Sequence, residues 1–96
     1  MKKSLLVTYD LHDKTKEQAV LTYIKKRQHT ELTESTYMVL TSHTVKQFRD
    51  GMAREAGGKR NITCFVFRAK RPWAAAGEGE DYDDACAWLK ANLVDD

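Results

Sequence analysis

Three segments of the chain have the residue pattern of extended strands, and two of them, 4–10 and 62–69, have apolar residues on both faces. The three segments are residues 4–10 (SLLVTYD), 36–41 (TYMVLT) and 62–69 (ITCFVFRA). All three are rich in β-branched and aromatic residues, which favours strands. Because strands that are apolar on both faces are typical of the interior of a sheet, we expect 4–10 and 62–69 to be central strands.

Two segments with helical spacing of apolar residues begin with a Thr-x-x-Gln pattern. The pattern occurs at Thr15–Gln18 and again at Thr44–Gln47, and it is typical of a capping box at the start of a helix. We therefore expect one helix from about 15 to 27 and a second from about 44 to 56. The second ends at Gly57-Gly58, where glycine allows the chain to leave the helix.

A third helix is expected near the C-terminus. Apolar residues at spacings of three and four form one helical face there: Tyr82, Ala85, Cys86, Leu89 and Leu93. Acidic residues fill the expected first turn, beginning at Asp81, where the helix dipole favours them. This acidic helix and tail span residues 78–96.

A shorter strand at 29–33 with a turn at Glu34-Ser35 completes a hairpin with 36–41. The order of elements is then βαββαβ followed by a helix. This order predicts the α+β class, and more finely a ferredoxin-like two-layer sandwich with helices on one face and an added C-terminal helix. The length of 96 residues fits a single ferredoxin-like domain over 1–96.

The length and composition of the chain predict its oligomeric state and its cellular compartment. A chain this short buries a modest core, so we expect a homodimer. No apolar run is long enough for a membrane span or a signal peptide. Cys64 and Cys86 lie at apolar-patterned positions and are expected to be buried free thiols, which is typical of a cytoplasmic protein.

The charge is unevenly distributed along the chain. Residues 1–77 carry eight more cations than acids, whereas residues 78–96 carry six more acids than cations. A basic body suits contact with phosphates. The acidic segment could mask that body, pair with a second subunit or keep the protein in solution.

Four blocks of the chain resemble, in the same order, the SinR-like group related to the Cas-two proteins of CRISPR systems. The blocks are LLVTYDL at 5–11, ESTYMVLT at 34–41, VKQFRDGM at 45–52 and ITCFVFRA at 62–69, with Trp73-Ala74 shortly after the last. Two features depart from the group's pattern: Gln28-His29-Thr30 stands where the pattern tends to be aromatic, and AAAGEGED is inserted before the last helix.

This resemblance implies a ferredoxin-like protomer that dimerises through its sheet and carries Asp10 near the dyad. In Cas-two proteins the pair of equivalent aspartates has been interpreted as a divalent-metal site for cutting RNA or DNA, whereas other members act as scaffolds. The related VapD group is linked to RNA cleavage.

Asp10 is the candidate catalytic and metal-binding residue, because it ends a strand where open sheets present functional groups. Two copies of Asp10 across a dyad could hold Mg²⁺ or Mn²⁺ together with substrate phosphates. Asp13 could add a second ligand, and His12 could add a ligand or a proton shuttle. The alternative is structural: Asp10 would bind loop amides, and Asp13 would begin the first helix cap.

A group of cations and one aromatic residue forms the candidate nucleic-acid interface. Its members bracket the segment 62–69: Lys59, Arg60, Arg68, Lys70, Arg71 and Trp73. Cations can contact the phosphate backbone, and an aromatic ring can stack on a base. The alternative is a solvated rim in which Trp73 packs under the acidic linker or at a dimer contact.

Taken together, these features favour a Cas-two-like, dimeric nucleic-acid-binding protein of a bacterial or phage cytoplasm. Metal-dependent cleavage of RNA or DNA is the more specific hypothesis. The competing hypothesis is a non-catalytic dimeric adaptor or scaffold that binds a protein partner.

Overall fold

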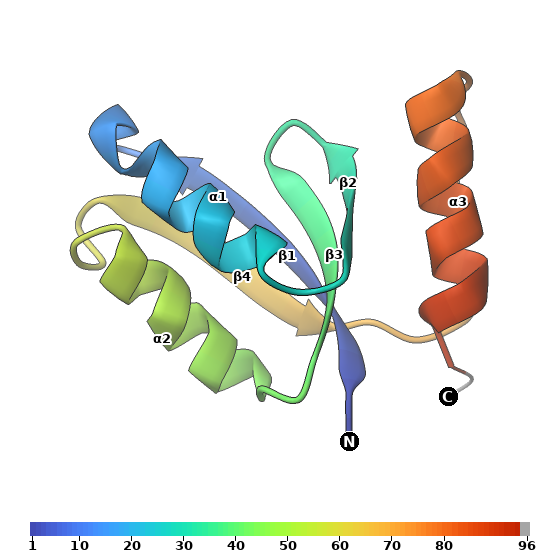
Figure 1. The fold of residues 1–96 in the computed structure, drawn as a ribbon, viewed down its shortest axis with the longest axis horizontal. Coiled ribbons are helices and arrows are strands. Elements are labelled where there is room, and N and C mark those ends of the chain that lie inside the picture. The colour runs from blue at the N-terminus through green and yellow to red at the C-terminus, as the bar shows by residue number, and fades with distance from the viewer. Residues whose placement is uncertain (95–96) are drawn as a thin grey trace.

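The computed structural model describes residues 1–94, which form one antiparallel four-stranded sheet and three α-helices. The elements are β1 (Lys3–Leu11), a 3₁₀ turn (Lys14–Lys16), α1 (Glu17–Lys25), β2 (His29–Thr33), β3 (Thr36–Thr41), α2 (Val45–Glu55), β4 (Ile62–Arg68) and α3 (Glu80–Asn92). The strand order is β2-β3-β1-β4, as Figure 1 shows. The predicted α+β class is confirmed.

Strand β1 lies inside the sheet and supplies one row of the main core. It pairs with β3 on one side and β4 on the other, which confirms the prediction that it is central. Its alternate residues face α1 and α2, and the core between these layers consists mainly of Leu5, Val7, Tyr9, Leu11, Val20, Tyr23, Ile24, Tyr37, Val39, Phe48, Met52, Ala56 and Ile62. Two helices over one face of a sheet bury that face efficiently.

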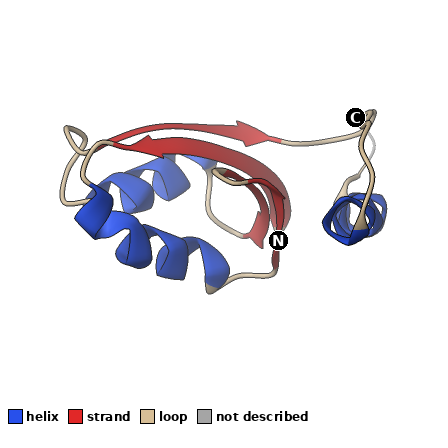
Figure 2. Cartoon of the chain, turned by 90° about the horizontal axis from the view of Figure 1, so that it is seen from above, coloured by secondary structure: helices blue, strands red, loops and turns tan. Residues whose placement is uncertain are grey.

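Helix α3 lies apart from α1 and α2, beyond one side of the curved sheet (Figure 2). It packs on the face of the sheet that α1 and α2 do not cover, contrary to the expectation that all helices cover one face. Successive residues of a strand point to opposite faces of the sheet, so β3 has apolar residues on both faces. Met38 points away from the main core and is almost fully buried, because Leu89 and Leu93 of α3 cover it. Leu6, Leu32, Ala69, Trp73 and Trp88 pack around the same cluster.

Strand β4 is an edge strand, so the prediction that it is central is wrong. It pairs only with β1. Its inner face packs toward α2, but Phe65 and Phe67 on its outer face remain 58% and 57% exposed. The apolar residues of β4 therefore do lie on both of its faces, but its outer face is not covered by another element within residues 1–94.

The two Thr-x-x-Gln patterns have different outcomes. At Thr44 the capping box is present: the Thr44 hydroxyl accepts from Gln47 N–H at 3.1 Å, and the Gln47 side chain accepts from Thr44 N–H at 2.9 Å. Gly57 follows α2 with φ +85°, a left-handed conformation that glycine adopts readily, so the predicted end of this helix is confirmed.

The pattern at Thr15–Gln18 is not a capping box. Asp13 caps a 3₁₀ turn by accepting from Thr15 N–H at 3.1 Å, and α1 begins only at Glu17. The Gln18 amide instead donates to the Thr22 hydroxyl at 3.3 Å. Asp13 therefore caps the 3₁₀ turn before α1 rather than α1 itself, whose N-cap position is Lys16.

The hairpin of β2 and β3 is confirmed, with Glu34 and Ser35 in its turn and a register shift between Glu31 and Thr33. Cys64 and Cys86 are free thiols as expected, but both are half-buried rather than buried. Burial raises the pKa of the Cys64 thiol, partly offset by the charge of Arg49. Within residues 1–94, no helix has the length and apolarity that crossing a bilayer requires.

Candidate nucleic-acid interface and the face that carries Asp10

On the outer side of β1 and β4, the surface from Phe67 to the Asp10 end is not covered by a helix within residues 1–94, whereas Leu6 packs against the cluster that α3 covers. Cross-strand register places Leu6 opposite Phe67, Thr8 opposite Phe65 and Asp10 opposite Thr63. Directly opposed residues of antiparallel strands lie on the same face. We call the surface made by Thr8, Asp10, Thr63, Phe65 and Phe67 the open face.

Asp10 lies at the carboxyl end of the open face and is exposed. With Thr8, Tyr9, Thr63 and Phe65 it lines a shallow hollow of about 140 Å³. Its carboxylate makes no hydrogen bond or ion pair to any residue in the range 1–94. The structural alternative, in which Asp10 binds loop amides, is therefore not what the structure contains.

The Asp13 carboxylate, unlike that of Asp10, accepts hydrogen bonds from a neighbouring residue. Its Oδ1 atom accepts from the Thr15 hydroxyl at 2.6 Å and from Thr15 N–H at 3.1 Å. These hydrogen bonds from Thr15, more than the nearby charge of Lys16, lower the pKa of the Asp13 carboxyl. Asp13 thus has a local structural role at the start of α1.

Among residues 1–94, no group of three or more His, Cys, Asp or Glu side chains could together hold a metal ion. One chain therefore offers the Asp10 carboxylate on the open face as a single ligand. Hard cations such as Mg²⁺ accept one or two carboxylates together with waters and substrate phosphates. The donor type fits, and a second carboxylate could come from another copy of the chain or from Glu17 or Glu34, which line with Asp10 a second hollow of about 80 Å³.

His12 is held between the loop after β1 and the turn before β4. Its N–H donates to the Asn61 carbonyl at 2.7 Å. Its ring binds on both sides, with Nδ1 3.0 Å from the Arg60 carbonyl oxygen and Nε2 3.0 Å from the Thr63 hydroxyl. The ring therefore has one defined orientation beside the open face.

The predicted basic residues fall into two groups rather than one cluster. Lys59 and Arg60 lie in the turn before β4, whereas Arg68 ends the strand and Lys70 follows it. Seven residues of strand at about 3.3 Å each separate the groups by roughly 20 Å. All four residues are exposed, and none of them forms an ion pair within residues 1–94.

The remaining two members of the predicted interface hold α3 in place. The Arg71 guanidinium donates to the Lys90 carbonyl at 2.8 Å, and Arg71 N–H donates to the Val94 carbonyl at 2.7 Å. Trp73 is half-buried against the cluster of Met38, Leu89 and Leu93. The structure thus ties Arg71 and Trp73 to the last helix, and their role differs from that of the other four cations.

A groove between α2 and the free edge of β4 was not predicted, because it depends on β4 being an edge strand. Its volume is about 540 Å³, and Arg49, Ala53, Lys59, Ile62 and Cys64 are among its lining residues. Arg49 is partly neutralised by Asp50, with 2.8 Å between the two charged groups. Lys59 adds to this groove a cation that has no ion-pair partner among residues 1–94.

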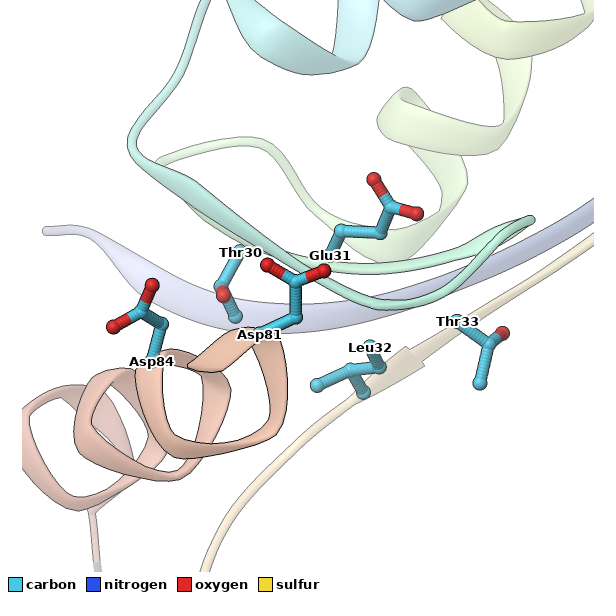
Figure 3. Close-up of a pocket in the computed structure, with 6 residues that line it drawn as sticks. All are labelled: Thr30, Glu31, Leu32, Thr33, Asp81 and Asp84. Atoms are coloured by element: carbon cyan, nitrogen blue, oxygen red, sulfur yellow. The ribbon is translucent and has the colours of Figure 1, made fainter. Parts of the chain in front are cut away.

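The acidic residues lie at the opposite edge of the sheet. Helix α3 packs beside β2 (Figure 1). The four cations lie instead at the two ends of β4. Glu31, Asp81 and Asp84 line a hollow of about 340 Å³ between β2 and the start of α3. Figure 3 shows that Asp84 points away from Asp81, and Glu31 accepts from the Tyr37 hydroxyl at 3.3 Å, so these carboxylates do not converge.

No family model matches the chain, and comparisons with curated proteins and with solved structures gave no match either.

Proposed function

We propose that this protein is a homodimer with a ferredoxin-like fold that binds single-stranded RNA or DNA along β4. The observation that carries the proposal is the set of four cations without ion-pair partners in residues 1–94, namely Lys59, Arg60, Arg68 and Lys70. Such cations on both ends of one strand suit a phosphate backbone that runs along it. The strand order and the resemblance to the SinR-like and Cas-two group support the same fold and function.

The distribution of charge supports this placement. The acidic first turn of α3, with Glu80, Asp81 and Asp83, lies across the sheet from β4. Phosphates at β4 would therefore be far from those carboxylates. The Lys59 side of the groove between α2 and β4 extends the cationic surface along the same edge.

Dimerisation through the open face is the second part of the proposal. Phe65 and Phe67 are more than half exposed, and both lie on this face of β4. Exposed apolar patches on a small protein mark interaction sites, and burial of a phenylalanine ring strongly favours association. Two open faces packed together would bring both Asp10 carboxylates to the same interface.

Metal-dependent cleavage is the finer form of this proposal. The two Asp10 carboxylates would bind Mg²⁺ or Mn²⁺ together with a substrate phosphate, and the ion would supply positive charge to the phosphate. Asp13 is assigned no part in this site, because its carboxylate caps the turn before α1. If the open face instead binds a protein partner, the chain is an adaptor without this metal site.

Fluorescence anisotropy with labelled single-stranded RNA and DNA, measured over a range of salt concentrations, tests the binding. Removal of one cation that binds a phosphate should flatten the log–log salt slope by about 0.7. The double change Arg68→Ala with Lys70→Ala should therefore weaken binding and reduce the slope by roughly twice that amount. The matched control is Lys25→Ala with Lys26→Ala, which removes two exposed cations from the end of α1. Equal effects of the two pairs would refute a binding site at β4.

A further inference from the structure

We propose that the groove between α2 and the free edge of β4 binds one unstacked nucleotide of the nucleic-acid strand. The inference rests on the proposed function, because the strand must first bind along β4. Of the groove's lining residues within 1–94, only Thr63 also belongs to the open face, so a dimer formed through that face leaves the groove accessible. The groove's volume of about 540 Å³ is within the range of about 300 to 1,000 Å³ that small-molecule sites have.

The walls of the groove are apolar and include two small side chains. Ala53 of α2 and Cys64 of β4 are half-buried against the main core, and Ile62 is part of that core. Because alanine and cysteine have short side chains, the helix and the strand leave a space here that larger side chains would fill. The face of a base would be removed from water against this surface, whereas a free phosphate would gain nothing from it.

Two charged side chains at the rim of the groove offer an acceptor beside donors. The Arg49 Nε and Nη2 atoms donate to Asp50 Oδ1 at 3.0 and 2.8 Å, whereas Oδ2 has no hydrogen bond within residues 1–94. Asp50 Oδ2 can therefore accept from an N–H on the edge of a base, and Arg49 has further N–H groups that can donate to a neighbouring ring nitrogen or carbonyl. Each common base has both kinds of group side by side, so this rim binds a base without selecting one.

Lys59 supplies the charge for the phosphate of the same nucleotide. It lines the groove, is exposed and has no ion-pair partner among residues 1–94. Arg49, in contrast, is already partly neutralised by Asp50. A phosphate held at Lys59 would lie at the basic end of β4 that Lys59 and Arg60 form, which is where the proposed strand passes the groove.

Fluorescence anisotropy with two labelled DNA oligomers of equal length tests this inference. One is oligo-dT and the other is abasic throughout, so they carry the same phosphates and differ only in their bases. Wild type should bind oligo-dT about fivefold or more tightly, the lower end of what a pair of base contacts contributes. Ala53→Leu fills the groove and should remove this difference while leaving the affinity for the abasic oligomer unchanged. Ala87→Leu, the same change at an exposed position of α3, is the matched control and should keep the difference.

The two free thiols provide a second measurement on the unaltered chain. Cys64 lines the groove, whereas Cys86 lies on α3. Oligo-dT should therefore slow the alkylation of Cys64 by iodoacetamide, followed by mass spectrometry, and leave the rate at Cys86 unchanged. The abasic oligomer should protect Cys64 less than oligo-dT does.

The outcomes separate this inference from the proposed function. Equal affinity of wild type for the two oligomers would overturn the nucleotide site and leave phosphate binding along β4 standing, whereas absence of binding to either would overturn both. A base-dependent difference that survives in Ala53→Leu, or a Cys64 that oligo-dT does not protect, would also overturn the inference. If Ala53→Leu does not fold, as melting would show, Asp50→Ala takes its place, because it removes the acceptor at the rim from an exposed position and must likewise reduce the difference.

Discussion

Asp10 and Asp13 stand three residues apart, but their carboxylates have different surroundings. Asp13 has two hydrogen bonds from Thr15, whereas Asp10 has none within residues 1–94 and lines the hollow on the open face. A carboxylate without local partners gains most from a cation, because nothing else offsets its charge. Asp10 is therefore the residue at which a divalent ion should have its effect.

We expect Mg²⁺ or Mn²⁺ to raise the melting temperature of the wild type, and Asp10→Asn to abolish both that rise and the proposed metal-dependent cleavage. The amide keeps the shape of the side chain but removes its charge, so binding of the ion to the folded protein no longer stabilises it. Melting curves with and without metal provide the measurement. Asp83→Asn, an exposed change in α3, is the control and should keep the metal response. The same response in Asp10→Asn as in wild type would exclude Asp10 as a ligand.

Tyr37 provides a test at alkaline pH. Burial, together with the nearby charge of Glu31, raises the pKa of Tyr37 from 10.0 to about 12. Its stabilising effect is present below pH 10, where the phenol is protonated in folded and unfolded chains alike. That effect is lost as the pH rises from 10 to about 12, because the unfolded chain releases the proton first.

We therefore expect Tyr37→Phe to make the free energy of unfolding less dependent on pH between 10 and about 12. The variant loses the hydrogen bond to Glu31, so it should be slightly less stable than wild type at neutral pH. Urea titrations at several pH values measure both effects. An unchanged slope of stability against pH in this range would mean that Tyr37 does not titrate as described.

Among the helices and strands, local sequence patterns predicted where each element lies along the chain better than which elements it packs against. The capping box at Thr44 was recognised because both of its hydrogen bonds form within four residues. At Thr15 the same spacing does not form a capping box. Asp13, two residues earlier, accepts hydrogen bonds from Thr15 and caps a turn there instead. A pattern of residue types does not show which of two nearby acceptors is used.

Helix α3 is the element whose packing departs most from the expectation. It covers the outer face at β2 and β3, and Leu89 is one of its buried residues, 8% exposed. A charge at this position would be buried without a partner. A substitution that breaks this contact should therefore lower the free energy of unfolding of the whole chain.

We expect Leu89→Asp to lower the free energy of unfolding by about 3 kcal/mol or more, because apolar packing is removed and a charge is buried. Ala87→Asp introduces the same charge on an exposed position of α3 and is the matched control. Its effect should be within about 0.5 kcal/mol. Equal stability of the two variants in urea would show that α3 does not pack on the sheet in solution.

At the scale of the whole molecule, the order of strands decides what could be predicted about the site. Asp10 was identified from its place at the end of a strand, and that did not depend on neighbours. The contact of His12 with Thr63 joins residues 51 positions apart, and the groove beside α2 requires β4 to be an edge strand. Neither feature can be predicted from a short stretch of sequence, because both arise only when segments far apart in the chain pair in the sheet.

The apolar pattern of β4 shows the same limit. Phe65 and Phe67 predict burial of the outer face, but the pattern is the same whether a helix, a second chain or another partner covers it. In this chain α3 covers the β2 side and leaves β4 open. We propose that a second copy of the chain covers the open face, in a dimer formed through these two phenylalanines.

Sedimentation velocity at micromolar concentration tests for this dimer. We expect wild type to sediment as a species of twice the 11.0 kDa mass of one chain, and Phe65→Ser combined with Phe67→Ser to sediment as a folded monomer. Val45→Ser, which changes an exposed apolar residue on α2, should leave the dimer intact. A wild type that sediments only as an 11.0 kDa species, or a double variant that remains a dimer, would show that the open face does not form this dimer.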